Sequence, residues 1–455
     1  MRRLGEPVLL GIDDTDGPNG GCTTHALTEV IRAAQGLGAD LIGNPRLVRL
    51  NPNVPWKTRG NAALAARFGV GRGVPRLAGR FPEGPVHAYP RGSELDPRTA
   101  HRLVDAAWDA VDRLAPADEP RTDPALVAVH RPLPARLYRA AVRRVVTLRE
   151  VRRVLDTAGA ELRHRRRQRG LIGASAAVAW SGRRATFELV AYRSGDRGGT
   201  PRELDRASVH RVEHRYPELF LCTDPRTRRV MIAPHTACPV LLGLRATRPE
   251  RLPQALSEIR GEPWERWIVF RTNQGTGDHV VPSWAGDLNS YDAASVVGRV
   301  ATPPTALRGG HVAFALRDGR GDRLDCLVFE PSKTLPHIAQ RLRVGDRLRV
   351  WGGRGRDRAF RVEGIEVRDT AARMERGPVP PCPECGGHLG SSGRRASLRC
   401  RHCRAVVPRS FVPVRPEVSP LTPGVYHPTP SARRHLAPLP VLEPRALRPV
   451  CAHAV

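Results

Sequence analysis

The chain has 455 residues but only two lysines, Lys57 and Lys333, among 74 basic residues. It also lacks any apolar run near the roughly 18 residues that a membrane-spanning helix needs. The apolar run that follows Arg2 and Arg3 is interrupted by Asp13, too early for a secretory signal peptide. We therefore expect a soluble cytoplasmic protein, and its length suggests about three domains.

A disulfide framework is also missing. Four of the nine cysteines form two close pairs near the C-terminus. The other five are scattered along the chain: Cys22, Cys222, Cys238, Cys326 and Cys451. Such scatter is typical of an intracellular protein with reduced thiols.

Negative charge is scarce, since 45 acidic residues face 74 basic ones and leave a net charge of +29. A GC-rich genome would replace lysine by arginine, but it would not create an excess of positive charge. The excess favours a nucleic acid as partner. Against this background, Lys57 suggests a position where a compact ammonium serves better than a guanidinium fork.

The most informative motif lies near the N-terminus. An apolar run predicts a buried strand over residues 7–12, and helical spacing predicts a helix over 24–34. Asp13, Asp14 and Asp16 follow the strand, and Gly20 and Gly21 lead into the helix. Carboxylates bind Mg²⁺, while glycine amides and a helix N-terminus bind phosphate. We interpret the motif as a site for a metal-bound polyphosphate.

This motif has two other interpretations. A surface turn rich in Gly and Asp is an open alternative for an isolated match. An EF-hand fits badly, because the sixth loop position counted from Asp14 is Asn19 instead of Gly and the twelfth is His25 instead of Glu.

A second polar loop follows a strand predicted over residues 46–50. Prolines bound this loop over residues 51–61, and it carries Trp56, Lys57, Thr58, Arg59 and Asn61. These donors suit phosphate or an RNA backbone. A solvated structural loop is an equally consistent interpretation.

Residues 156–288 change to a different order of elements. Strands are predicted over 185–192, 219–222, 229–232, 240–244 and 267–271, and helices over 201–215 and 249–259. With one extra strand, this is the β-α-β-β-α-β order of a ferredoxin-like domain. The last strand ends at Arg271 and is followed by Asn273 and Gln274, and these three residues are candidate ligand contacts. The small residues of 170–177 predict a helix packed tightly on a neighbour.

Residues 289–372 predict five strands, over 296–301, 311–317, 323–329, 346–351 and 359–367. A helix over 335–342 falls between the third and fourth strands. This is the order of an OB-fold β-barrel, which binds single-stranded nucleic acid.

The two cysteine pairs lie in residues 378–410. Cys382 and Cys385 are followed, after fourteen residues, by Cys400 and Cys403. Four thiolates at this spacing predict a structural zinc ribbon with a closed tetrahedral site. An iron cluster suits so short a ribbon less well. Residues 411–455 form a basic tail rich in Pro and Arg.

Several blocks resemble the isoleucine-tRNA 2-agmatinylcytidine synthetase family, in the family's order and over about the whole chain. They are GIDDTD (11–16), CTT (22–24), RLNPNVPWKTRGN (49–61), GLIGA (170–174), PHTACPV (234–240), FRTNQGT (270–276) and the cysteine pairs. Residues 85–130 match no block of the family. The resemblance implies a multidomain α+β protein: a kinase-like α/β domain over 1–155, then the ferredoxin-like domain, the OB-fold and the zinc ribbon.

The resemblance also implies an ATP-dependent ligase that modifies tRNA. Such an enzyme attaches agmatine to C2 of the wobble cytidine of the isoleucine tRNA with a CAU anticodon, so that the codon AUA is decoded as isoleucine. The resemblance implies that ATP phosphorylates the C2 carbonyl oxygen. The agmatine amine then attacks C2, and the phosphorylated oxygen leaves as phosphate. The family's kinase domain also phosphorylates itself on the first Thr after the Cys, here Thr23.

Residue roles follow from the matched motifs. The catalytic set is Asp13, Asp14, Asp16, Thr23, Lys57 and Arg59, with the three aspartates as Mg²⁺ ligands. The ATP-binding set is Gly20, Gly21, Thr23 and Thr24. The candidate substrate contacts are Asn61, Arg271, Asn273 and Gln274.

The sequence leaves two other functions to compare. A non-catalytic nucleic-acid-binding protein would use the OB-fold and zinc ribbon but leaves the N-terminal carboxylates unexplained. An ATP-dependent enzyme for a small metabolite leaves the charge and the C-terminal modules unexplained. ATP turnover that requires added tRNA separates the three.

Overall fold

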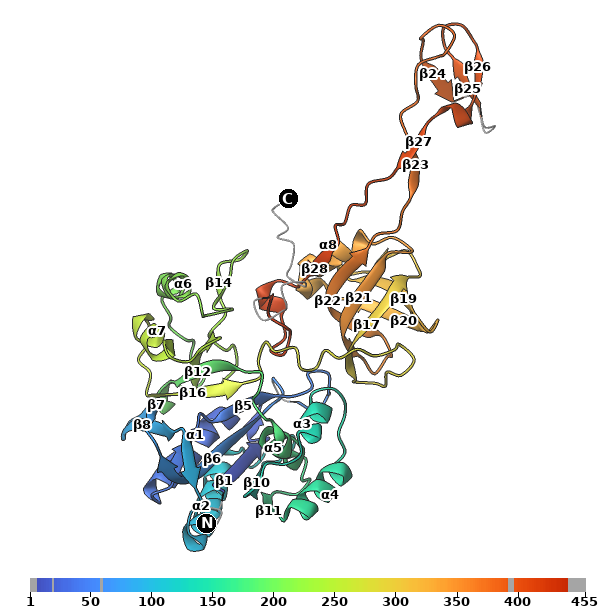
Figure 1. The fold of residues 1–455 in the computed structure, drawn as a ribbon. Coiled ribbons are helices and arrows are strands. Elements are labelled where there is room, and N and C mark those ends of the chain that lie inside the picture. The colour runs from blue at the N-terminus through green and yellow to red at the C-terminus, as the bar shows by residue number, and fades with distance from the viewer. Residues whose placement is uncertain (1–5, 19, 58–59, 392–396, 441–455) are drawn as a thin grey trace.

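The computed structural model describes residues 6–18, 20–57, 60–391 and 397–440. Figure 1 shows three bodies: a large α/β unit built on one sheet, a β-barrel, and a small ribbon at the end of a thin arm. None of the helices in the described ranges is long and apolar enough to cross a membrane.

In the large sheet, β1 (Val8–Asp13) pairs antiparallel with β6 (Ala62–Arg72) and β10 (Ala125–Val129). Helices cover both faces, so β1 is apolar at nearly every position. One face packs on α1 (Thr23–Gly36) and α2 (Pro97–Leu114). The strand and helix predicted around the carboxylate motif are confirmed.

The remaining elements of this unit complete the sheet and its other cover. The helices are α3 (Ala135–Ala141), α4 (Leu148–Ala158) and α5 (Gly170–Ala179). The strands are β4 (Asp40–Ile42), β5 (Arg46–Arg49), β7 (Arg76–Phe81), β8 (Gly84–Tyr89), β9 (Arg91–Ser93) and β11 (Glu161–His164).

Helix α5 lies unusually close to β1, as its run of small residues predicted. A Cβ on Gly173 would lie 1.8 Å from Oδ2 of Asp13, and one on Gly11 would lie 2.4 Å from the carbonyl oxygen of Ala174. Only glycine fits at these two contacts. The close packing holds the N-terminal end of α5 beside the carboxylates that follow β1.

The sheet continues without a break into the second part of the chain. Strand β16 (Arg266–Thr272) pairs antiparallel with β7 and parallel with β5, and β12 (Thr186–Tyr192) and β15 (Val240–Ala246) follow it. The result is a single twelve-stranded sheet. Strand β11 pairs with β10, so the first part of the sheet extends beyond residue 155.

The second part differs from expectation in two elements. The helix predicted over 201–215 is wrong in its first five residues: α6 is Arg206–Arg215, because the Asp205 carboxylate caps the amides of Ala207 and Ser208. The strand predicted over 219–222 is also wrong, since in that range only Leu219 forms a bridge, to Ala246. A separate hairpin, β13 (Thr223–Asp224) with β14 (Arg229–Val230), follows instead, and α7 is Leu252–Glu258.

The barrel contains the five predicted strands and the predicted helix. They are β17 (Ala293–Val300), β19 (Val312–Asp318), β20 (Arg323–Val328), α8 (Thr334–Gln340), β21 (Arg347–Arg354) and β22 (Phe360–Asp369). Pairing of β17 with both β19 and β21 closes the barrel, and β20 runs parallel to β22. Two short strands flank it, β18 (Thr305–Ala306) and β28 (Gly424–Tyr426).

The arm is the two-stranded ladder of β23 (Met374–Arg376) and β27 (Val414–Pro416). At its end lies a three-stranded sheet of β24 (Leu389–Ser391), β25 (Ser397–Cys400) and β26 (Val406–Pro408). This small sheet stands far from the barrel in Figure 1.

Candidate active site

The first cavity, which we call the carboxylate cavity, opens at the end of β1 and has a volume of about 310 Å³. Asp13, Asp14 and Asp16 line one side. The facing wall is largely apolar and comes from the 51–61 loop, the segment after α3 and helix α5. Its larger apolar side chains are Leu50, Val54, Trp56, Val145, Val146 and Ile172. The cavity thus joins an acidic end to an apolar end.

Burial dominates the electrostatics of the acidic end. It raises the pKa of Asp13 well above its ordinary value, and the charge of Asp14 raises it further. Burial also raises the pKa of Asp14, to about 6, although the guanidinium of Arg169 opposes the shift. Nη2 of Arg169 lies 3.3 Å from Oδ2 of Asp14. Two buried carboxylates with one partly compensating cation favour the binding of a further cation.

Backbone geometry fixes the turn that follows. Asp14 has φ +59° and Gly21 has φ +71°, and a Cβ on Gly21 would lie 2.4 Å from the carbonyl oxygen of Thr15. The short strands β2 (Asp16–Gly17) and β3 (Gly20–Gly21) pair across the turn and deliver the chain to Cys22, the N-cap of α1. The predicted glycine turn therefore precedes a helix N-terminus, as phosphate binding requires.

The 51–61 loop contributes two of its predicted residues to this cavity, Lys57 and Asn61. Nζ of Lys57 donates to the carbonyl oxygen of Pro52, and Nδ2 of Asn61 donates to that of Asn51 at 3.0 Å. Burial and neighbouring arginines lower the pKa of Lys57. Arg59, also predicted as catalytic, lies outside the described residues.

A second cavity, which we call the basic cavity, has a volume of about 490 Å³ and shares Asp16, Gly60 and Ala62 with the first. Thr23 and Thr24 line it. The structure therefore places the two threonines across Asp16 from the carboxylate cavity, and does not place them with Asp13 and Asp14. Asp16 is the acidic side chain common to both cavities.

Cationic side chains dominate the basic cavity. Its arginines and histidines are Arg49, Arg229, Arg245, Arg433, Arg434, His235 and His435. The carboxylate of Glu188 lies between two of them, 3.6 Å from Nη2 of Arg49 and 3.3 Å from Nε of Arg245. The charge of Arg49, together with burial, holds the pKa of His435 well below its ordinary value, so this imidazole is neutral.

The three candidate contacts at the C-terminal end of β16, Arg271, Asn273 and Gln274, lie in different surroundings. Gln274 lines the basic cavity beside Glu188 and Arg245. Asn273 is buried: its Oδ1 accepts from the Arg49 amide at 2.7 Å, and its Nδ2 donates to the Arg49 carbonyl and to the Tyr138 hydroxyl, each at 2.8 Å. Both the oxygen and the nitrogen of its side-chain amide are hydrogen-bonded within the protein, mainly to the backbone of Arg49. Asn273 therefore holds β5 in place.

Arg271 is not brought to either cavity by the described structure. Its Nη2 donates to the carbonyl oxygen of Gly182 at 2.6 Å, and its backbone amide donates to that of Pro45. Like Asn273, it supports the backbone around the site.

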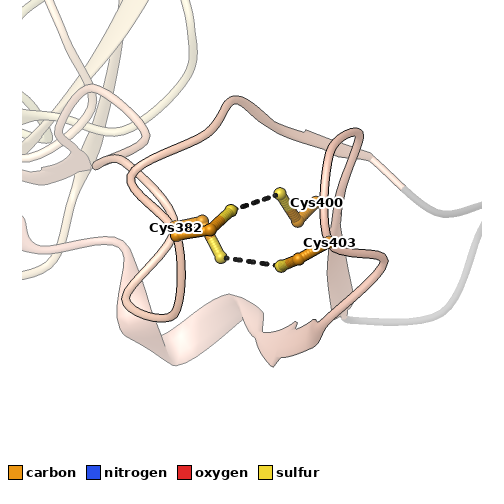
Figure 2. Close-up of side chains that lie close together, drawn as sticks. Cys382, Cys400 and Cys403 are labelled. Atoms are coloured by element: carbon orange, nitrogen blue, oxygen red, sulfur yellow. Dashed lines mark hydrogen bonds between the residues drawn. The ribbon is translucent and has the colours of Figure 1, made fainter.

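The four predicted zinc ligands converge, and their sulfur atoms all lie within 4.8 Å of one another. The sulfur atoms of Cys382 and Cys403 are 3.6 Å apart, and those of Cys385 and Cys400 are 3.5 Å apart. Figure 2 shows Cys382, Cys400 and Cys403 pointing toward one point. Zn–S bonds of about 2.3 Å in a tetrahedron require S–S edges of about 3.8 Å, so the quartet fits this ion.

The aspartates do not form a comparable cluster. Among the described residues, this cysteine quartet is the one group of three or more ligands within such a distance. Mg²⁺ usually takes one or two carboxylates together with waters and substrate phosphates. Asp13, Asp14 and Asp16 are therefore suited to share that role with a bound polyphosphate.

Sequence reasoning missed three contributors to the cavities. Arg169 pairs with Asp14 from the turn before α5, and residues 429–440 of the tail supply Arg434 and His435 to the basic cavity. Arg144 lines the carboxylate cavity. The GLIGA block follows Arg169 directly, so its position was a usable signal; nothing in the tail sequence indicated where it would dock.

Comparisons with known proteins agree with this architecture. Family models for the TiaS TCKD domain and the TiaS FLD domain match residues 9–165 and 168–279. The isoleucine-tRNA 2-agmatinylcytidine synthetase TiaS of Methanosarcina mazei is 36% identical over 96% of this chain and 98% of its own. The enzyme of the same name from Archaeoglobus fulgidus is 34% identical over 94% and 96%.

Solved structures extend the similarity to the whole fold. The crystal structure of TiaS in complex with its isoleucine tRNA and ATP superposes with a TM-score of 0.83 at 30% identity, over 98% of this chain and 99% of the other. A complex of TiaS with the same tRNA, AMPCPP and agmatine gives 0.78 at 29% identity, over 97% and 98%. This chain belongs to the isoleucine-tRNA 2-agmatinylcytidine synthetase family.

Proposed function

We propose that this chain is an ATP-dependent ligase that attaches agmatine to C2 of the wobble cytidine of the isoleucine tRNA with a CAU anticodon. The observation that carries the proposal is the pair of cavities that meet at Asp16 and Gly60. One offers carboxylates and an apolar wall, and the other offers arginines. Relatives that align over nearly the full chain carry this activity in their names, and solved relatives hold an isoleucine tRNA with ATP or with an ATP analogue and agmatine.

The domain assignments belong to the same proposal. The unit built on β1 serves as the kinase-like domain, the β12–β15–β16 part as the ferredoxin-like domain, the closed barrel as the OB-fold and the cysteine-bearing sheet as the zinc ribbon. The sequence places their limits at 1–155, 156–288, 289–372 and 378–410, and the pairing of β11 with β10 favours a first limit near residue 165 instead of 155. A substrate that is a tRNA is consistent with the cytoplasm as the site of action.

Each set of residues has a physical task in this reaction. Asp13, Asp14 and Asp16 would hold Mg²⁺, which offsets charge on the transferred phosphoryl group. The Gly20 and Gly21 turn, which pairs with Asp16 and Gly17, would hold phosphate oxygens where the two cavities meet at Asp16. Lys57, Arg59 and Asn61 would approach the same group from the 51–61 loop. The apolar wall suits a planar purine.

The basic cavity suits the RNA substrate. Phosphates beside the wobble nucleotide carry negative charge, and wobble-base chemistry requires the base to leave its stack. Arg229, Arg245 and Arg433 line the cavity that would receive this nucleotide. Neutral His435 and Gln274 provide hydrogen-bonding groups that carry no charge.

Analysis of the nucleoside product tests the activity directly. Incubation with ATP, agmatine and the tRNA should increase the mass of the wobble nucleoside by that of agmatine less one water. Omission of ATP or agmatine should leave it unmodified. An unmodified nucleoside in the complete mixture would contradict the proposed reaction and leave the non-catalytic alternative, which does not explain the carboxylate cavity.

Thr23 is proposed to accept a phosphoryl group. It is buried, lines the basic cavity and lies at the start of α1. We expect γ-labelled ATP to label the protein on this residue, and Thr23→Ala to lose the label, whereas Thr157→Ala, at an exposed site on α4, should retain it. Equal labelling of Thr23→Ala and the parent would refute the site, and a small loss of stability with normal activity would indicate a purely structural role.

Salt should weaken tRNA binding strongly. With a net charge of +29, binding should release condensed cations, so log affinity should fall linearly as log salt rises. Base contacts are less sensitive to salt, so the preference for the CAU anticodon should persist. Affinity that does not respond to salt, or equal binding of duplex DNA at physiological salt, would contradict this prediction.

A further inference from the structure

Residues 429–440, which we call the strap, bind the barrel side of the protein to the large sheet. The strap leaves β28 at the barrel and follows the loop after β16. Gly275 donates to the carbonyl oxygen of His435 at 2.8 Å, and Gly277 donates to that of Leu436 at 3.0 Å. Leu436 is buried in the core below α5. The strap is therefore fixed to the sheet unit by backbone bonds and by a core side chain.

One side chain of the strap contacts both bodies. Nε of Arg434 lies 3.2 Å from Oε1 of Glu363 on β22 of the barrel. Its Nη1 donates to Oδ1 of Asn53 in the 51–61 loop at 2.8 Å. The other carboxylate oxygen of Glu363 lies 3.1 Å from Nε2 of buried His279. Arg434 thus connects a fixed barrel carboxylate to the loop that carries Lys57.

The same loop also rests on the barrel directly. A Cβ on Gly353 of β21 would lie 1.9 Å from Nδ2 of Asn53, so the loop reaches the bare backbone of this strand. Asn51 donates to the carbonyl oxygen of Tyr291 at 2.9 Å, and the ring of Trp56 lies 6.1 Å from the ring of Tyr291. These contacts with the barrel come from Asn51, Asn53 and Trp56. The same loop continues to Gly60, which lines both cavities.

We infer that Arg434 is a positioning residue that couples the seating of RNA on the barrel to the placement of residues 51–57 in the ATP site. The inference rests on the proposed function. RNA bound to the barrel fixes the barrel relative to the sheet unit, and the Glu363–Arg434–Asn53 chain transmits that placement to Lys57, Gly60 and Asn61. ATP turnover then depends on tRNA because RNA on the barrel stabilises the contacts of Arg434 with Glu363 and Asn53 that hold residues 51–57 beside the ATP site.

A double-mutant cycle tests this coupling. ATP turnover is measured with and without saturating tRNA in Arg434→Met, in Asn53→Ala and in the double variant. Each single change should reduce the tRNA-stimulated kcat by about tenfold, as a displaced catalytic loop would. Because both changes cut one link, the double variant should be no slower than the worse single variant. Arg98→Met, an exposed arginine on α2, is the matched control and should respond like the parent.

Binding measurements separate positioning from direct RNA contact. The tRNA Kd of Arg434→Met should change by less than about threefold, with an unchanged salt slope. A weaker Kd with a salt slope reduced by about 1 would identify Arg434 as a phosphate contact and overturn the inference. Multiplicative losses in the double variant would overturn it as well. If the parent itself shows no tRNA-dependent ATP turnover, the proposed function fails; if the parent responds and Arg434→Met responds equally, only the coupling fails.

Discussion

Asp14→Asn should abolish ATP consumption and, at neutral pH and without metal, make the protein more stable. The activity is lost because a neutral amide neither binds Mg²⁺ strongly nor offsets its charge. The fold should survive, since asparagine is among the residues that best tolerate the φ of +59° found here. Asp16→Asn should lose activity for the same reason. In both variants tRNA affinity should stay close to that of the parent, and ATP turnover at the parental rate in either would disprove the assignment.

The stability gain has a defined pH window. Burial raises the pKa of Asp14 from 3.8 in the unfolded chain to about 6. The folded state therefore keeps a proton that the unfolded state releases, so stability falls as pH rises between these two values. Above pH 6 the ionised carboxylate of Asp14 lowers the free energy of unfolding by about 3 kcal/mol. Asn has no charge to bury, so the variant does not lose this stability. Melting curves in EDTA should show the advantage of Asp14→Asn at pH 7.5 and its disappearance near pH 4. Asp109→Asn, at an exposed site on α2, serves as the control, and overlapping curves for Asp14→Asn and the parent would contradict the shift.

Removal of the cysteine quartet should weaken tRNA binding and spare the chemistry at the ATP site. The parent should contain one Zn²⁺ per chain, and Cys382→Ser with Cys385→Ser should contain none. Without the ion, the small three-stranded sheet has almost no core of its own, so it should unfold locally. Its arginines would then lose their fixed arrangement, and tRNA affinity should fall by about tenfold or more.

The arm explains why this damage should stay local. The ribbon joins the barrel through the β23–β27 ladder, so the main melting transition should not move. Cys451→Ser, a change outside the quartet, should leave zinc content and affinity unaltered. Absence of zinc from the parent by elemental analysis, or unchanged tRNA binding by the double variant, would contradict this prediction.

Local signals in the sequence were sufficient for the acidic end of the site and for the barrel. The carboxylates, the glycine turn and the cysteine pairs lie within short segments whose spacing determines their geometry. Residues 85–130 matched no family block, yet they contain α2 and strand β10, the neighbour of β1 in the large sheet. Asp96 as N-cap and Pro97 at the first helical position were signals for α2 that could have been used.

The walls of the basic cavity could not be predicted in this way. Glu188, Arg245 and His435 come from strands and a strap that are far apart in sequence, and only tertiary packing brings them together. For Asn273 and Arg271 the residue type was misleading. Both are polar residues at a strand end, a pattern typical of ligand contacts, but their side chains bind neighbouring backbone. Sequence alone does not reveal which partner such a side chain selects.

The pairing of β16 with β5 and β7 has a consequence for how the protein can be divided and inherited. A cut between the first two parts of the chain would separate β16 from β5 and β7 and leave unpaired strand edges on both fragments. Exposed strands of this kind recruit other chains and aggregate. Fragments made near residue 165 should therefore be insoluble when expressed alone, and soluble only when co-expressed. The same reasoning applies to evolution. We expect genes to gain or lose the kinase-like and ferredoxin-like parts together, because neither part has a complete sheet without the other.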